Sequence, residues 1–319
     1  MEMENHFDVI VIGGGPAGLT AGIYLSRAKL NTLILNEGTV GGQLVLTHEV
    51  ANYPGVESIS GYELARNMKS QAQKFGCKIR ANIKITSLDF KDDIKKVTVN
   101  DKEVFTSNSV IMALGGRSRT IGVPGEEKFK GKGISYCATC DGDFFQDKEI
   151  IVVGGGNSAL EEAVSLTKYA SKVTIIHQFD HFQAFEHYVN EAKENDKINF
   201  IMESKIIEFM GSEKLSSVKI QNQKTGDISE MPIDGVFIFI GYIPNTENLE
   251  GIIKLNEWKE IIVDGNLMTN VAGVYAAGDC IPKKYRQITT AVADGTVAAL
   301  NAAEFINNIK TQNEYLVTG

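Results

Sequence analysis

The chain has 319 residues, of which 43% are apolar and 23% charged, a composition typical of a globular protein large enough for two domains. Its net charge of -8 argues against general nucleic-acid binding, and no apolar run reaches the ~18 residues of a membrane span. Glu2 and Glu4 stand where a secretion signal would be basic, so we expect a cytoplasmic protein.

The first expected element is a buried parallel strand, because residues 7–12 form a short apolar run. A glycine-rich turn follows, then an amphipathic helix and a second apolar strand that ends at Glu37. In such a unit Gly13 allows the tight turn, Gly15 lets a pyrophosphate approach the backbone, and Gly18 lets helix and strand pack. The helix N-terminus faces the phosphates, and Glu37 would accept hydrogen bonds from a ribose. This context predicts a dinucleotide-binding fold.

A Cys-x-x-Cys pair, Cys137 and Cys140, is followed at once by Asp141. Two thiols at this spacing can close a reversible disulfide, and an adjacent carboxyl can deliver or accept the protons of the exchange. The alternatives for the pair are half of a zinc site, which lacks a second pair of ligands, and a chance spacing; the alternative for Asp141 is a simple helix N-cap. Cys77 and Cys280 stand singly and are expected in or near the core. The pattern therefore predicts a redox dithiol rather than a metal site.

A second glycine-rich unit follows the dithiol. Residues 149–153 form another apolar strand, and Gly154, Gly156 and Ala159 give a GxGxxA turn before a helix and a strand over 172–177. The same turn can also serve strand–helix packing alone, so it does not by itself establish a second nucleotide site.

A third glycine signal at residues 273–279 comes after the second unit and suggests that the first domain is completed by the C-terminal segment. Residues 113–116 and 241–245 place glycine or proline after a strand and are the expected crossings between domains. We therefore expect an α/β protein with two Rossmann-like, three-layer ββα dinucleotide-binding domains, the second inserted into a discontinuous first. The expected ranges are 1–117 and 244–319 for the first domain and 118–243 for the domain that carries the dithiol.

Several motifs together resemble the low-molecular-weight thioredoxin reductases, a branch of the flavoprotein disulfide reductases with two dinucleotide folds. The resemblance spans nearly the whole chain. The motifs are the glycine turn at 13–18, Gly41-Gly42-Gln43-Leu44, Asn52-Tyr53-Pro54-Gly55, Cys137-Ala138-Thr139-Cys140-Asp141-Gly142, Gly278-Asp279 and Arg286-Gln287.

The resemblance implies a homodimer that binds FAD and reduces thioredoxin. It implies that Cys140 faces the flavin, Cys137 attacks the partner disulfide, and Asp141 donates and accepts the proton. The FAD contacts that it implies are Gly13, Gly15, Pro16, Ala17, Gly18, Glu37, Gly42, Gln43, Asn52, Ala113, Gly115, Gly278, Asp279 and Gln287.

The chain departs from the family at the nucleotide site of the second domain. NADPH-dependent members carry three arginines after the second strand, which bind the 2′-phosphate; this chain has Gln178, Phe179 and Gln183 there. Losing several charge-assisted contacts, each worth roughly 1.5–3 kcal/mol, predicts NADPH binding weaker by orders of magnitude. No acid ends the strand to bind the free hydroxyl of NADH either, since His177 stands there.

In this respect the chain resembles the ferredoxin-dependent flavin thioredoxin reductases, so we expect reduced ferredoxin as the electron donor. Ferredoxin is acidic, and two basic segments are candidate docks: residues 117–132, and Lys283, Lys284 and Arg286. The first alternative is an NAD(P)H-dependent thioredoxin reductase that uses NADH. The others are a reductase for another small disulfide protein and a flavin-binding redox sensor without a donor.

Overall fold

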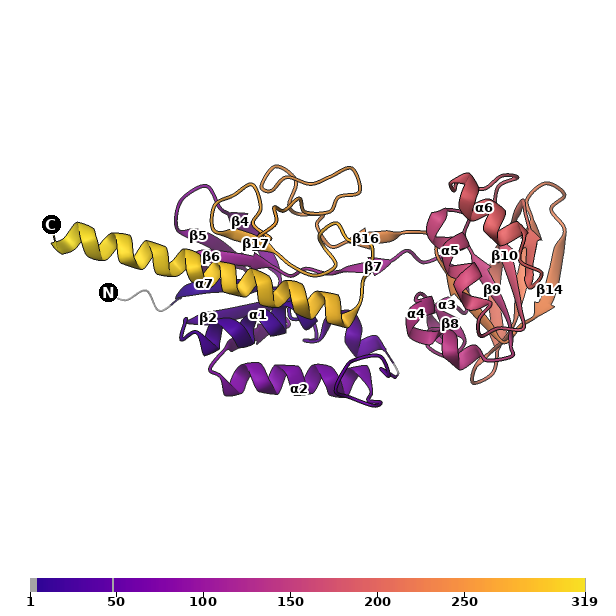
Figure 1. The fold of residues 1–319 in the computed structure, drawn as a ribbon, viewed down its shortest axis with the longest axis horizontal. Helices are drawn as coiled ribbons and strands as arrows, with labels where there is room; N and C mark the ends of the chain where they lie inside the picture. Colours follow the sequence, from indigo (N-terminus) through magenta and orange to yellow (C-terminus); the bar gives the residue numbers. More distant parts are fainter. Residues whose placement is uncertain (1–4, 48, 319) are drawn as a thin grey trace. The chain divides into compact units, whose positions relative to one another are not determined.

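In the computed structural model the chain divides into two compact units, formed by Met1–Arg117 with Ile243–Gly319 and by Ser118–Tyr242 (Figure 1). The structure describes residues 5–47 and 49–318, and for residues 313–318 only the backbone. The second crossing falls between Tyr242 and Ile243, one residue before the expected boundary.

The first unit is built on a sheet of order β3-β2-β1-β6-β5-β4, with β17 also paired to β6. Strands β1, β2, β3, β6 and β17 run parallel, and β4 and β5 form an antiparallel extension. The elements are β1 (His6–Ile12), α1 (Pro16–Arg27), β2 (Thr32–Asn36), η1 (Gly42–Leu46), α2 (Gly61–Lys74), β3 (Lys78–Ala81), β4 (Ile85–Asp89), β5 (Lys95–Val99), β6 (Glu103–Met112), β17 (Val274–Ala276) and α7 (Ile288–Thr318).

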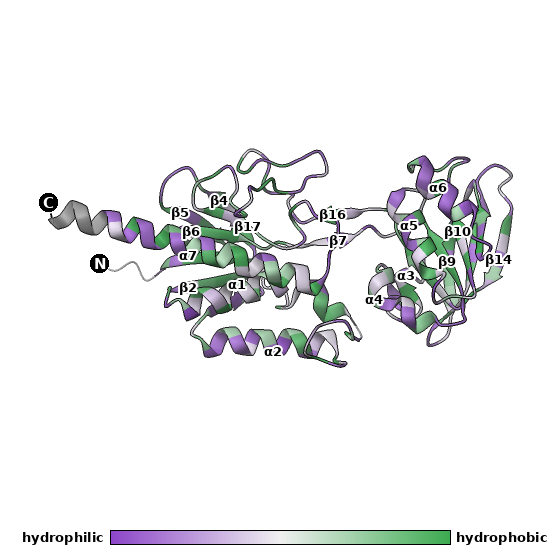
Figure 2. Ribbon diagram, viewed as in Figure 1, coloured by the Kyte–Doolittle hydropathy of each residue, from purple (hydrophilic) through white to green (hydrophobic). Residues whose placement is uncertain are grey.

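Two apolar cores lie on opposite faces of this sheet, because side chains alternate along each strand. Val9 and Val11 pack with the helices α1, α2 and α7, whereas Ile10 and Ile12 pack with β5 and the segment that precedes β17. Figure 2 shows α2 as alternately hydrophobic and hydrophilic. The result is a three-layer unit completed by the C-terminal segment.

The second unit repeats the plan with an all-parallel sheet of order β11-β10-β9-β15-β8. Ile150 and Val152 on β9 face α5, and Ile151 and Val153 face an antiparallel sheet of β12, β13 and β14. The elements are α3 (Glu126–Phe129), β8 (Ile134–Ser135), α4 (Ala138–Asp141), η2 (Gly142–Phe145), β9 (Glu149–Val153), α5 (Asn157–Leu166), β10 (Lys172–Ile176), α6 (Glu186–Lys193), β11 (Ile198–Ile201), β12 (Ser204–Gly211), β13 (Leu215–Asn222), β14 (Ile228–Pro232) and β15 (Gly235–Ile238).

The two crossings pair with each other as a two-stranded sheet of β7 (Gly116–Ser118) and β16 (Tyr242–Pro244). The architecture confirms the expected class: α/β, with two Rossmann-like three-layer folds, the second inserted into a discontinuous first. No helix within the described residues is long and apolar enough to cross a membrane.

Candidate active site

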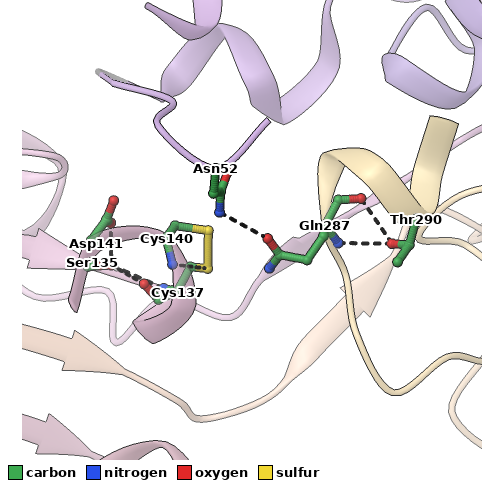
Figure 3. Close-up of a disulfide and its surroundings, with 7 residues drawn as sticks. All are labelled: Asn52, Ser135, Cys137, Cys140, Asp141, Gln287 and Thr290. Carbon is green, nitrogen blue, oxygen red and sulfur yellow. Dashed lines mark hydrogen bonds between the residues drawn. A yellow bond between two sulfur atoms is a disulfide. The ribbon is translucent and has the colours of Figure 1, made fainter. Parts of the chain in front are cut away.

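Cys137 and Cys140 form a disulfide, with their Cα atoms 5.3 Å apart (Figure 3). Cys137 caps the short helix α4 in extended conformation, and the N–H of Cys140 donates to Cys137 Sγ at 3.2 Å. A hydrogen bond to sulfur favours its charged form over the thiol. Once the disulfide opens, this N–H therefore stabilises a thiolate on Cys137, the residue that the family resemblance assigns as the attacking thiol.

Asp141 lies at the end of α4, and its carboxylate accepts the hydroxyl of Ser135 at 2.5 Å (Figure 3). Its side chain makes no cap hydrogen bond to the η2 helix that follows, so it is not the simple helix cap left open by the sequence. Burial raises the pKa of Asp141, the Ser135 hydrogen bond opposes that rise, and nearby Asp143 adds to it. A carboxyl with a raised pKa beside a disulfide is suited to carry a proton.

The two other cysteines contrast with this pair. Cys77 and Cys280 are buried, as expected, and burial raises the pKa of each thiol to about 11. They remain protonated at neutral pH and therefore unreactive in thiol exchange.

A buried carboxylate near the dithiol, that of Glu126, was not expected from the sequence. Glu126 is 4% exposed and accepts three hydrogen bonds, from the N–H of Ile121 at 3.0 Å, the N–H of Gly122 at 2.7 Å and the hydroxyl of Tyr136 at 2.6 Å. Tyr136 immediately precedes Cys137, so Glu126 links the side chain next to the redox turn to the backbone of residues 121–122. A Glu-Glu pair on a short helix carries no sequence signal for such a role.

The residues expected to bind FAD lie in the first unit, mostly where parallel strands end. Gly13 follows β1, Glu37 follows β2, Ala113 follows β6, and Gly278 comes soon after β17. These four strands are neighbours in the sheet, so the structure gathers the loops at its carboxyl edge, where open α/β sheets bind ligands.

The glycine turn of this unit fits a dinucleotide pyrophosphate. A Cβ on Gly13 would lie 2.1 Å from the carbonyl oxygen of Ala113, and one on Gly18 would lie 1.9 Å from that of Gly13, so both positions are closed to side chains. Gly15 differs, since its Cβ would meet nothing nearer than the Cα of Gly42 at 3.9 Å. Gly15 also caps α1, with Pro16 and Ala17 in its first turn, so the open space faces a helix N-terminus that favours phosphate.

The strand that faces this turn, β2, ends one residue earlier than expected. Strand β2 stops at Asn36, and the Asn36 side chain accepts the N–H of Gly14 at 2.7 Å. Glu37 lies just beyond and is exposed, and one of its oxygens accepts the N–H of Ile85 at 2.7 Å. A carboxylate has further acceptor sites, so the geometry leaves Glu37 able to bind a ribose.

The remaining predicted contacts come from separate loops of the same unit. Asn52 donates to Gln287 at 3.4 Å, and the backbone N–H of Gln287 donates to Thr290 at 3.1 Å (Figure 3). Gln43 is exposed on η1, beside Gly42. Elsewhere in the unit, Asp279 follows Gly278 in the loop after β17, and Gly115 accepts the N–H of Asn245 at 3.1 Å.

The glycine turn of the second unit is covered differently. A Cβ on Gly155 would lie within 2.3 Å of the His177 ring, which is 5% exposed, whereas a Cβ on Gly156 would meet nothing nearer than 4.0 Å. Phe179 and Phe182 pack on His177, with ring centroids at 5.3 and 5.7 Å. The positions of the three missing arginines thus belong to an aromatic loop, whose Gln183 N–H donates to the carbonyl of Gly155 at 2.8 Å.

The two basic segments expected to bind ferredoxin are largely engaged within the chain. Lys283 pairs with Asp294, and Arg286 pairs with Glu260.

In the segment of residues 117–132, Arg117 pairs with Glu247, Lys128 donates to the carbonyl of Gly211, and Lys130 lies over the Tyr136 ring. The three ion pairs offset part of the positive charge that these segments can offer to an acidic partner.

Known proteins match this chain over almost its full length. A model of the pyridine nucleotide-disulphide oxidoreductase family matches residues 7–295. A thioredoxin reductase from Peptoclostridium litorale is 44% identical over 314 residues, which cover 96% of this chain and 99% of that protein. The 34.2 kDa protein in the rubredoxin operon of Clostridium pasteurianum is 44% identical over 306 residues, with 96% of this chain and 99% of that protein covered.

Among solved structures, the thioredoxin reductase from Streptococcus pyogenes MGAS5005 matches with a TM-score of 0.92 at 38% identity, over 96% of this chain and 100% of that one. Thioredoxin reductases of this family bind FAD, which agrees with the open glycine turn of the first unit. The chain belongs to the low-molecular-weight thioredoxin reductases of the pyridine nucleotide-disulphide oxidoreductase family.

Proposed function

We propose that this protein reduces the disulfide of thioredoxin through the Cys137–Cys140 pair. The observation that carries the proposal is the disulfide itself, with the partly buried Asp141 carboxyl and the N–H that donates to Cys137 Sγ on the same helical turn. FAD, when bound, supplies the two electrons that convert this disulfide to a dithiol. The FAD site would be formed by the loops at the carboxyl edge of the first sheet, and residues 118–242 would carry the dithiol.

The dithiol acts by thiol–disulfide exchange. The Cys137 thiolate attacks one sulfur of the thioredoxin disulfide, so that a mixed disulfide forms and the other thioredoxin sulfur leaves. Asp141 gives this leaving thiolate a proton. Cys140 then returns its proton to the Asp141 carboxylate and attacks Cys137 Sγ, the second thioredoxin sulfur leaves as a thiolate, the Cys137–Cys140 disulfide re-forms, and reduced thioredoxin is released.

For the electron donor, the comparisons favour the nicotinamide alternative over ferredoxin, since the matched family is named for pyridine nucleotides. Gly156 at the start of α5 leaves open the place of a pyrophosphate. Because Gln178, Phe179 and Gln183 replace the phosphate-binding arginines, NADH is the nicotinamide that we propose.

A specific observation keeps reduced ferredoxin as the second candidate. The buried His177 ring occupies the face of Gly155, residues 178–183 after it include no arginine or lysine for a 2′-phosphate, and no acid stands at the strand end for a ribose. A donor that never enters this site would meet no such obstacle.

A reductant test distinguishes the two. The FAD-loaded protein is mixed anaerobically with NADH, NADPH or reduced ferredoxin, and the flavin absorbance is followed. Rapid bleaching by NADH supports the first proposal, and a Gly156→Ala variant should then need about tenfold more NADH while dithionite reduces it normally. If only reduced ferredoxin bleaches the flavin, and does so equally in the wild type and in Gly156→Ala, ferredoxin replaces NADH as the proposed electron donor.

The acceptor and assembly are tested separately. Dithionite-reduced protein should reduce thioredoxin, and a panel of other small disulfide proteins shows whether thioredoxin is preferred. Normal FAD binding without reduction of any acceptor would instead indicate a redox sensor. We also propose the homodimer that the family resemblance implies, which sedimentation of the FAD-loaded protein checks.

A further inference from the structure

The hydroxyl of Ser135 contacts both sides of the redox turn (Figure 3). Ser135 Oγ lies 2.5 Å from Asp141 Oδ2, accepts the N–H of Cys137 at 3.1 Å, and lies 3.3 Å from the Cys137 carbonyl oxygen. The residue is 4% exposed and ends β8, where it pairs in register with Phe237 of β15. Its position is therefore fixed by the sheet and not by the turn that it contacts.

A serine hydroxyl has one hydrogen to donate and two lone pairs to accept with. The N–H of Cys137 uses one lone pair. When Asp141 is ionised, the Ser135 hydrogen points to the carboxylate. When Asp141 is protonated, its O–H can donate to the second lone pair, and the Ser135 hydrogen can turn to the Cys137 carbonyl. Both protonation states of the carboxyl thus find a partner at the same oxygen.

We infer that Ser135 is a positioning residue that lets the partly buried Asp141 give up and regain its proton without losing its hydrogen bond. The inference rests on the proposed function, in which Asp141 protonates the leaving thiolate of the acceptor. During exchange the Cys137–acceptor bond forms, the acceptor S–S bond breaks, and the Asp141 proton moves to the leaving sulfur. The carboxylate that remains is the group that the Ser135 hydroxyl stabilises.

The surroundings of Asp141 set the direction of the expected effect. Asp143 on η2 opposes ionisation, and α5, which packs against α4, carries the carboxyls of Glu161 and Glu162. Among these neighbours, the Ser135 hydroxyl is the group that lowers the pKa of Asp141 against its burial. Removing it should therefore raise the pKa of Asp141 and keep the proton bound to higher pH.

The test is donor-independent. FAD-loaded protein, its disulfide already reduced by dithionite, is mixed with oxidised thioredoxin or with hydroxyethyl disulfide between pH 5 and 10. Hydroxyethyl disulfide releases a basic thiolate that needs a proton; dithiobis(nitrobenzoate), whose thiolate leaves unprotonated, is the control acceptor. The proteins compared are wild type, Ser135→Ala, Ser135→Gly, Ser135→Thr and Asp141→Asn. Infrared titration of the Asp141 C=O band in the oxidised proteins gives a second readout.

In Ser135→Ala we expect the alkaline limb of the rate and the infrared midpoint to move up by about one pH unit, with both restored in Ser135→Thr. The Ser135→Gly variant replaces the alanine variant if that variant does not fold.

If the infrared midpoint does not move in Ser135→Ala, while the alkaline limb is abolished in Asp141→Asn, the role of Ser135 alone is overturned. A limb that survives in Asp141→Asn would overturn both this inference and the role of Asp141. Reduction of hydroxyethyl disulfide but not thioredoxin would overturn only the proposed acceptor, and Ser135 is then judged on the small disulfide.

Discussion

The imidazole of His177 lies against Gly155 where, in the first unit, the amide of Asn36 accepts the N–H of Gly14. Asn36 is the last residue of β2 and His177 follows the last residue of β10, the second strand of each βαβ motif, and both side chains face the middle glycine of their turn. The two glycine turns are thus alike in backbone and different in what covers them. This difference distinguishes the turn that is suited to FAD from the turn that the His177 ring covers.

The contact with His177 makes Gly155 intolerant of any side chain. A Cβ there would lie 2.3 Å from the ring, so Gly155→Ala should lower the free energy of unfolding by about 1–3 kcal/mol. Gly156→Ala is the matched control, because its φ of -91° suits alanine and its Cβ would have 4.0 Å of clearance. Urea unfolding measures both; equal stability of the two variants would contradict the packing seen here.

The first turn allows folding and FAD binding to be separated. Gly15→Ala should fold normally, since its Cβ clears Gly42 by 3.9 Å, but should bind FAD at least about tenfold more weakly because the methyl group enters the pyrophosphate space. Flavin fluorescence during titration of the apoprotein measures the affinity. Gly13→Ala is the contrast: with φ at +107° and a clash of 2.1 Å, it should fail to fold. Unchanged FAD affinity in Gly15→Ala would place the pyrophosphate elsewhere.

Glu126 should contribute strongly to stability through its three hydrogen bonds. In Glu126→Gln an amide replaces one oxygen and leaves a buried donor without a matching acceptor, so the free energy of unfolding should fall by about 1–3 kcal/mol. Glu127→Gln, at the exposed neighbouring position, should be within about 0.5 kcal/mol of wild type. If thermal unfolding shows no difference between them, the Glu126–Tyr136 contact does not hold the redox turn.

His177 should make stability depend on pH. Burial lowers the pKa of His177 in the folded protein below the unfolded value of about 6.5, so below that pH the unfolded chain binds a proton that the folded chain does not. Stability should therefore be complete above pH ~6.5 and fall as the pH drops toward the folded pKa. His177→Asn should remove this part of the slope in urea unfolding at pH 5 to 8. His181→Asn, at an exposed position, should retain the slope.

Much of the fold could be predicted from local sequence. The two glycine turns and the apolar strands before them identify βαβ units because tight turns and buried parallel strands restrict residue type strongly. One strand end differs from the expectation: β2 ends at Asn36, whose side chain accepts the N–H of Gly14, and not at Glu37. No local sequence pattern predicts that the Asn36 side chain binds the N–H of Gly14.

Part of the candidate redox site could also be predicted from local sequence. The spacing of Cys137 and Cys140 predicts a disulfide, because residues three apart in one turn come within bonding range. Ser135, Glu126 and Tyr136 carry no such pattern, and their hydroxyls and carboxylate acquire roles only where β8, α3 and α4 meet.

The fold class, the discontinuous first domain and a redox dithiol followed by an acid could be predicted from the sequence alone. These features depend on glycine at tight turns, on apolar residues in buried strands and on the short spacing of two cysteines. The hydrogen bonds of Ser135 to Asp141 and of Tyr136 to Glu126, and the contact of the His177 ring with Gly155, become visible only in the folded chain. Each of these contacts joins separate elements or a strand to a turn, and burial gives it its energy. Such contacts depend on how the layers pack, which residue type and spacing do not specify.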